Sequence, residues 1–175
     1  CLYACYQMLM WITSRHNFNP LNVPSINYAP DMYNRDSFWS LVGVYDKVAS
    51  ENIFNQWAST QTDKGAIGTI ITPAMGSKEA KDNEATLEFL WYALINNKRY
   101  GTPIPKDKVK KAFEYCINEF DPDRDGICRA EFALGQNDVV YYPGKTSDLS
   151  VNQGMFAISL KVAQDLGMPV TDEYI

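Results

Sequence analysis

The stretch Asn34-Arg35-Asp36-Ser37-Phe38-Trp39 opens a strongly apolar segment and decides how this 175-residue chain is interpreted. Apolar side chains continue after it at helical spacing, so we expect a helix from Asp36 to Ser50. The first turn of a helix has free N–H groups and partial positive charge, so it favours an ionised carboxylate. Arg35 beside Asp36 reinforces that preference.

An arginine and an aspartate followed by aromatic rings suit a ligand that carries many hydroxyl groups. The carboxylate of Asp36 can accept hydrogen bonds from sugar hydroxyls, and the guanidinium of Arg35 can donate them. The ring of Trp39 can cover the apolar face of the sugar. The alternative interpretation is structural: Asp36 caps the helix and Arg35 is its solvated neighbour.

Helical periodicity recurs along the rest of the chain, and strand-like alternation is scarce. We therefore expect an all-α fold. Six helices are predicted: Leu2 to Ser14, Asp36 to Ser50, Glu51 to Thr60, Asn83 to Asn96, Lys106 to Phe120 and Ser150 to Leu166.

Short and long connections alternate between these helices. The junction at Ser50-Glu51 is tight, whereas residues 16–35, 62–82 and 121–149 are long and rich in Pro, Gly, Asn and Asp. Loops of this length in a compact domain are usually functional. Since a long loop precedes every second helix, we expect antiparallel helical hairpins with the three long loops at one end.

Composition excludes several classes of function. The chain is 46% hydrophobic and 13% aromatic, which suits a globular protein with a sizeable core. Its net charge is −5 and its basic residues are scattered, so we expect no nucleic-acid partner. No apolar run reaches transmembrane length, so we expect no membrane partner. With one histidine and no CxxC motif among the four cysteines, a zinc site is not expected.

The acidic segment that begins at Asp121 looks like the calcium loop of an EF-hand. An EF-hand needs a bidentate glutamate at position 12, but here that position is Phe132 and the nearest acid, Glu131, is at position 11. We therefore expect no metal and interpret the segment as an acidic turn that ends the preceding helix. A non-standard calcium site is the alternative.

Three parts of the chain resemble the six-hairpin glycosidases. Residues 34–39 are similar to the Arg-Asp motif with which these enzymes hold a sugar. The stretch Asp82-Asn83-Glu84-Ala85-Thr86-Leu87-Glu88-Phe89-Leu90-Trp91 resembles their acidic helix opening after a loop over the active site. Asp125-Gly126, Gly135-Gln136-Asn137-Asp138 and Val151-Asn152-Gln153-Gly154-Met155-Phe156 resemble the segment that carries the general acid.

The resemblance implies an (α/α)6 barrel, as in glucoamylases, the amylo-1,6-glucosidase part of glycogen debranching enzymes, and trehalases. A complete barrel of this kind has twelve helices. Residues 1–175 are thus expected to form a single domain that is about half of a catalytic domain. Its expected partners are a carbohydrate substrate and the remainder of that domain, and no cofactor is expected. A large exposed apolar surface should mark the missing half.

The resemblance also implies roles for individual residues. Asp138 is the expected general acid, with Glu131 and Glu84 as alternatives. The aromatic-acid dipeptide that often marks this acid is absent, because Asn137 precedes Asp138. The residues expected to bind or line the substrate site are Arg35, Asp36, Trp39 and Tyr141, with Trp91 and Tyr142 as further aromatic candidates.

The implied function is a glycoside hydrolase that acts on an oligosaccharide or polysaccharide by carboxylate general acid catalysis. Three alternatives stay open. A non-catalytic helical-repeat binding module would give the same helical pattern. A calcium-binding helical protein would use the acidic loop, and an (α/α)6 phosphorylase or lyase would share the scaffold.

Overall fold

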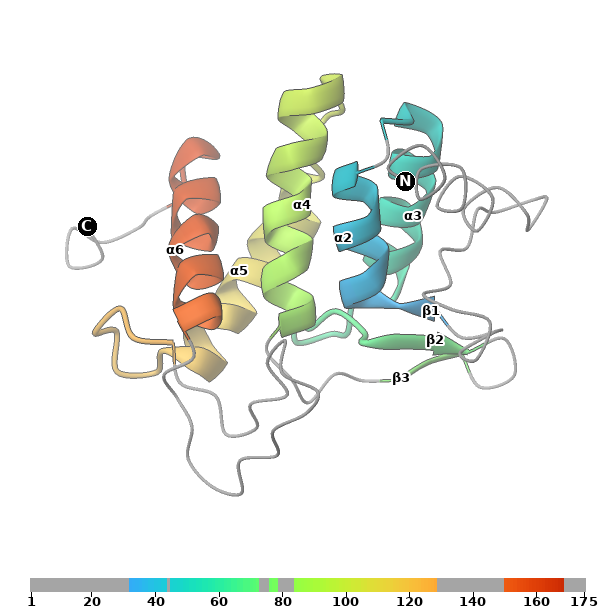
Figure 1. Ribbon diagram of the computed structural model, residues 1–175. Helices are drawn as coiled ribbons and strands as arrows, with labels where there is room; N and C mark the ends of the chain where they lie inside the picture. The colour runs from blue at the N-terminus through green and yellow to red at the C-terminus, as the bar shows by residue number, and fades with distance from the viewer. Residues whose placement is uncertain (1–31, 44, 73–75, 79–83, 129–149, 169–175) are drawn as a thin grey trace.

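The computed structural model describes residues 32–43, 45–72, 76–78, 84–128 and 150–168 (Figure 1). These residues are mainly helical, which confirms the prediction of an all-α fold class. The helix expected from Leu2 to Ser14 lies outside them. The elements are β1 (Met32–Tyr33), α2 (Asn34–Gly43), α3 (Lys47–Ser59), β2 (Ile70–Thr72), β3 (Gly76–Lys78), α4 (Glu84–Tyr100), α5 (Lys106–Phe120) and α6 (Ser150–Asp165).

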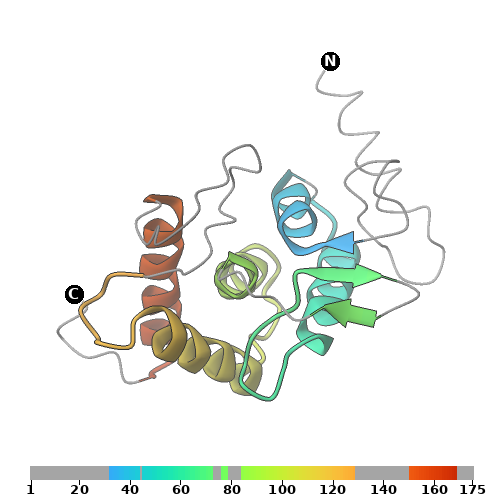
Figure 2. The same cartoon turned by 90° about the horizontal axis from the view of Figure 1, so that it is seen from below.

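Helix α4 is the centre of the arrangement and packs against the other four helices that the structure describes. Seen from below, α2, α4 and α6 lie in one row, and α3 and α5 lie in a second layer (Figure 2). The first residues of α2, α4 and α6 all lie at the lower end in Figure 1, together with the described loop residues 60–69 and 121–128.

Hydrogen bonds fix the opposite directions of α3 and α4. Near the start of α3, the hydroxyl of Ser50 donates to Asn96 near the end of α4, at 3.1 Å. At the end of α3, Thr60 Oγ1 accepts the N–H of Gly68 at 2.9 Å, and the N–H of the adjacent Ile67 donates to Thr86 Oγ1 in the first turns of α4, at 3.0 Å. The two helices are therefore antiparallel.

The junction between α2 and α3 differs from the prediction. We expected one helix from residue 36 to residue 50 and a tight junction at Ser50-Glu51, but α2 ends at Gly43 and α3 begins at Lys47. The cause is Asp46, whose carboxylate accepts a 2.9 Å hydrogen bond from the N–H of Ala49. This side chain caps α3, so the chain starts a new helix instead of continuing the old one.

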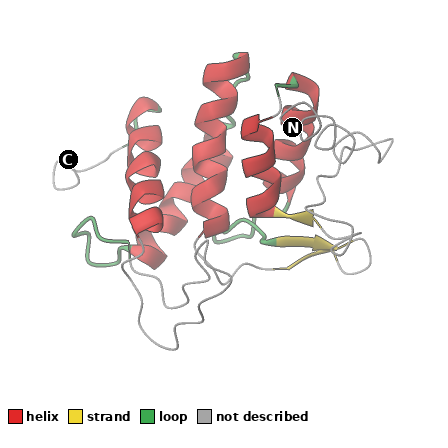
Figure 3. Ribbon diagram, in the orientation of Figure 1, coloured by secondary structure: helices red, strands yellow, loops and turns green. Residues whose placement is uncertain are grey.

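A small antiparallel sheet was not predicted. Its strand order is β1-β2-β3, with Met32 opposite Ile71 and Ile71 opposite Ser77. The strands have only two or three residues, too few for an alternating pattern to be visible in the sequence. The sheet lies beside the start of α2 at one end of the helices and is not central (Figure 3).

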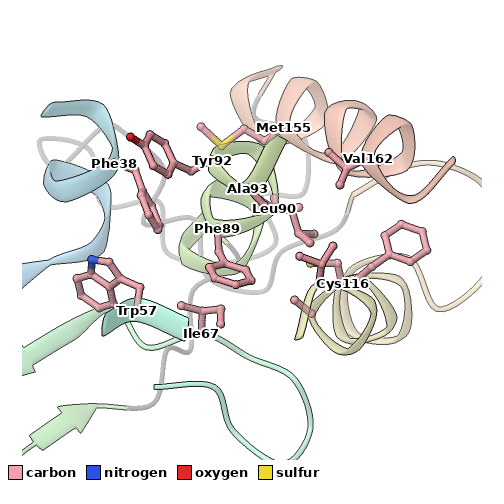
Figure 4. Packing of buried hydrophobic residues seen from close by; sticks show 14 of the residues in the cluster. Phe38, Trp57, Ile67, Phe89, Leu90, Tyr92, Ala93, Cys116, Met155 and Val162 are labelled. Carbon is pink, nitrogen blue, oxygen red and sulfur yellow. The ribbon is translucent and has the colours of Figure 1, made fainter. Parts of the chain in front are cut away.

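The core joins all five helices of the described residues and is rich in aromatic rings (Figure 4). Phe38 of α2 stacks on Tyr92 of α4 with ring centroids 4.9 Å apart, and Phe54 of α3 stacks on Phe89 of α4 at 4.7 Å. Burial of one such side chain contributes about 1.5–3 kcal/mol. The aromatic contacts thus fix α2 and α3 against α4.

None of the described helices combines the length and the hydropathy that crossing a bilayer requires.

Candidate functional site

The candidate site lies where α2 meets α4. On α2, Arg35 and Asp36 each lie one turn before Trp39, so the three residues share a side of the helix. Asp36 is the third residue of α2, because the helix already begins at Asn34. It is therefore not the residue that caps the helix, although it lies in the first turn, where a negative charge is favoured.

Helix α4 contributes the side chains of Glu88 and Trp91, which are about one turn apart. The side chain of Glu88 is completely buried. Its Oε1 atom accepts a hydrogen bond from Nε1 of Trp39, with a nitrogen–oxygen distance of 3.0 Å. The two helices therefore meet where Trp39 contacts Glu88.

Two aromatic rings complete the contact. The ring centroids of Trp39 and Trp91 are 4.8 Å apart, and the ring planes are inclined at 51°. Trp39 nevertheless keeps 44% of its surface exposed, whereas Arg35 and Asp36 on the same side of α2 are half-buried. We refer to Arg35, Asp36, Trp39, Glu88 and Trp91 together as the Trp39 cluster.

The Trp39 cluster offers an accessible aromatic surface whose direction is fixed by two contacts with α4. A guanidinium and a carboxylate accompany it on the preceding turn of the same helix. Rings provide an apolar surface for the C–H groups of a sugar, and the charged groups provide donors and acceptors for its hydroxyls. A combination of this kind suits recognition of a polyhydroxylated ligand.

The structure brings some predicted site residues together. Arg35, Asp36 and Trp39 share one side of α2, and Trp91 lies against Trp39. Glu84 is the first residue of α4, one turn before Glu88. The other predicted residues, Glu131, Asp138, Tyr141 and Tyr142, lie outside the described residues.

Sequence reasoning missed Glu88 as a member of the site. An acidic residue at a helix start is usually expected on the solvated side, and the resemblance to the six-hairpin glycosidases includes Glu88 only as part of an acidic helix opening. One signal was present in the sequence. Glu88 is flanked by Leu87, Phe89 and Leu90, all of which are buried, so an acid at this position has a core environment.

The acidic loop after α5 forms a self-contained turn. The carboxylate of Asp121 is buried and accepts the N–H groups of Asp125 at 3.0 Å and Gly126 at 3.1 Å. Arg124, in the left-handed region at φ 63°, donates to the carbonyl oxygens of Ile117 and Asp121. These bonds end α5 as an acidic turn does.

The same loop brings three carboxylates close together. Ligand atoms of Asp121, Asp123 and Asp125 lie within 4.8 Å of one another, a spacing that one cation can share. Both carboxylate oxygens of Asp121 already accept backbone N–H groups, however, and this is sufficient to explain the placement of that residue.

Two buried cysteines lie near this loop and have free thiols, Cys116 and Cys128. Burial raises the pKa of the Cys116 thiol well above its ordinary value. A thiol in that state is a poor nucleophile, since the thiolate is the reactive form. Cys128 has a structural contact instead: the side-chain amide of Gln153 in α6 pairs with its backbone N–H and carbonyl at 3.1 and 2.8 Å.

Comparison of the chain with protein-family models, with curated proteins and with solved structures gave no match.

Proposed function

We propose that this chain is part of a glycoside hydrolase that acts on an oligosaccharide or polysaccharide. The observation that carries the proposal is the Trp39 cluster. Trp39 is 44% exposed but is tied to Glu88 and packed on Trp91, and a guanidinium and a carboxylate lie one turn away. An exposed ring with a fixed direction and neighbouring charges of both signs suits a sugar better than it suits a purely structural contact.

The arrangement of the helices supports the same proposal. Helices α2, α4 and α6 form a row in which all three begin at one end, and α3 and α5 pack in a second layer. An (α/α)6 toroid has an inner and an outer layer of this type. We propose that the chain supplies about half of such a toroid, and that the remainder of the catalytic domain supplies the other half.

The proposed mechanism uses two carboxyl groups on opposite sides of the scissile bond. One is protonated and donates to the leaving oxygen, and the other is ionised and activates water or attacks the sugar. We assign the protonated group to Asp138, with Glu131 and Glu84 as alternatives. Arg35, Asp36 and Tyr141 would hold the hydroxyl groups, and Trp39 would cover a face of the ring.

The second carboxylate is proposed to come from the remainder of the domain. The general acid and Asp36 should both touch the sugar that is cleaved, so we expect them to lie about 5–10 Å apart, roughly the width of one sugar. We therefore propose that the general acid lies near the lower ends of α2, α4 and α6, where Asp36 and the start of α4 lie.

The test is substitution of each candidate acid in the full-length protein, as Asp138→Asn, Glu131→Gln and Glu84→Gln. Loss of the general acid should lower turnover of a natural glycoside by about 10²–10⁴-fold. Turnover of an aryl glycoside with a good leaving group should fall much less, because that group departs without protonation. If none of the three substitutions changes turnover, the assignment of the acid to this chain is wrong.

A further inference from the structure

We propose that Glu88 is a positioning residue, whose buried carboxyl group fixes the indole of Trp39 as an aromatic platform for the sugar. The inference rests on the proposed function and adds a residue to it. Glu88 does not reach the ligand in this proposal. It acts through Trp39, from the buried side of the contact between α2 and α4.

The hydrogen bond between the two side chains is specific. An indole has a single polar hydrogen, on Nε1, and can only donate. In this protein that hydrogen is directed at Oε1 of Glu88, with a nitrogen–oxygen distance of 3.0 Å. The bond determines which edge of the ring is turned towards α4 and therefore which part of Trp39 stays exposed.

Burial of the Glu88 carboxyl group between α2 and α4 costs free energy. Glu88 has no exposed surface and lies between the buried residues Leu87 and Phe89. Burial of a polar group is unfavourable unless hydrogen bonds replace its contacts with water, and an apolar side chain of similar size would avoid that cost. Packing alone therefore does not account for an acid at position 88, whereas a requirement to hold Trp39 does.

Helix α4 restrains Trp39 twice. Trp91 follows Glu88 by about one turn, and its ring lies 4.8 Å from that of Trp39 at an inclination of 51°. A tryptophan with 44% of its surface exposed would otherwise exchange between rotamers and lose that freedom on binding. Because two contacts with one rigid helix already restrict Trp39 in the free protein, less side-chain entropy is lost on binding. This is the function expected of residues that preorganise a binding site.

The first measurement reports on the contact without any ligand. In the full-length protein labelled with ¹⁵N-tryptophan, the Trp39 indole signal is identified by its absence in Trp39→Phe. We expect Glu88→Met to shift this signal and to speed exchange of its hydrogen with water by about tenfold, as loss of one hydrogen bond to a carboxyl group implies. Glu88→Gln keeps an acceptor oxygen, so the Trp39 indole signal and the exchange rate of its hydrogen should stay near the wild-type values.

The second measurement reports on the platform. Binding of maltotetraose, cellotetraose and mannotetraose is measured by titration calorimetry. For any tetrasaccharide that the wild type binds, Glu88→Met should weaken binding by about tenfold, and Glu88→Gln should largely restore it. Glu51→Gln is the matched control, because Glu51 also accepts a side-chain hydrogen bond, from Thr102 at 2.7 Å, at the other end of α4. It should leave both readouts unchanged.

Each outcome decides the inference. An unchanged Trp39 signal in Glu88→Met overturns it, as does a changed signal with wild-type affinity. If Glu88→Met does not fold, a double-mutant cycle of Trp39→Phe and Glu88→Gln replaces it. Non-additive losses of affinity then support the positioning role, and additive losses overturn it.

Failure of the proposed function gives a different pattern. If the wild type binds none of the tetrasaccharides, both the proposed function and the platform role are contradicted. The indole signal still decides in that case whether Glu88 positions Trp39.

Discussion

Tyr92 of α4 and Ser50 of α3 share a 2.5 Å hydrogen bond between their hydroxyl groups, inside the contact between the two helices. Ser50 also donates to Asn96 Oδ1, at 3.1 Å. A serine hydroxyl has only one hydrogen, so the Tyr92 hydroxyl is the donor to Ser50. This buried chain of hydrogen bonds ties α3 to the same helix that holds Glu88 and Trp91.

Stability at alkaline pH should depend on Tyr92. Burial raises the pKa of Tyr92 from 10.0 to about 12, so the folded protein holds this proton more tightly than the unfolded chain. The contribution to stability is complete below pH 10 and is lost as the pH rises towards 12. Tyr92→Phe removes this group, so its free energy of unfolding should fall less steeply over that range in urea titrations. An unchanged slope would contradict the assignment.

Arg99 should stabilise the end of α2. Its Nη1 donates to the carbonyl oxygens of Leu41 and Val42, both at 3.1 Å, and its guanidinium lies 4.3 Å from the ring centroid of Tyr45. Arg99→Met keeps the aliphatic stem and should lower the free energy of unfolding by about 1–2 kcal/mol. Arg99→Lys should recover less than half of the loss.

The neighbouring exposed residue Lys98 provides the control for Arg99. Lys98→Met should change the free energy of unfolding by no more than about 0.5 kcal/mol. Equal effects of the two substitutions would mean that the contacts of Arg99 with α2 do not contribute.

Gly65 should be intolerant of any side chain. Its φ is +108°, and a Cβ atom there would lie 2.2 Å from the carbonyl oxygen of Lys111 in α5. Gly65→Ala should therefore destabilise the protein by about 2–4 kcal/mol, from backbone strain and overlap together.

Gly101 is the matched position, with φ +69° and no atom within 4 Å of an added Cβ. Gly101→Ala should cost only about 1–2 kcal/mol, from the backbone alone. Thermal unfolding of the two variants separates the cost of steric overlap from the cost of backbone strain. Similar losses of stability in both variants would show that the loop after α3 moves to accommodate the added methyl group.

Local patterns predicted some elements well. The bounds of α5, Lys106 and Phe120, agree with the prediction, because its apolar residues recur on one face between charged ones. The α2–α3 junction was missed because Tyr45 and Val48 continue the apolar pattern of α2. Both are in fact exposed, at 71% and 66%, and Asp46 between them caps the next helix.

The residues of the candidate site were also predicted only in part. Arg35, Asp36 and Trp39 are close in sequence, so the pattern of one helix was sufficient to group them. Glu88 joins them only through a contact across 49 positions of the chain. No local pattern states which residue of α4 will meet Trp39, since that depends on how two helices pack.

The central claim is that the protein hydrolyses a glycoside, and analysis of its products in isotopically labelled water tests it most directly. The full-length protein is incubated with oligosaccharides in water enriched in heavy oxygen, with and without inorganic phosphate, and the products are analysed by mass spectrometry. We predict shortened sugars that carry one heavy oxygen atom at the new chain end, formed equally with and without phosphate and lost in Asp36→Asn. Products that form only with phosphate and carry a phosphoryl group, or oligosaccharides that bind but remain intact, would contradict the claim.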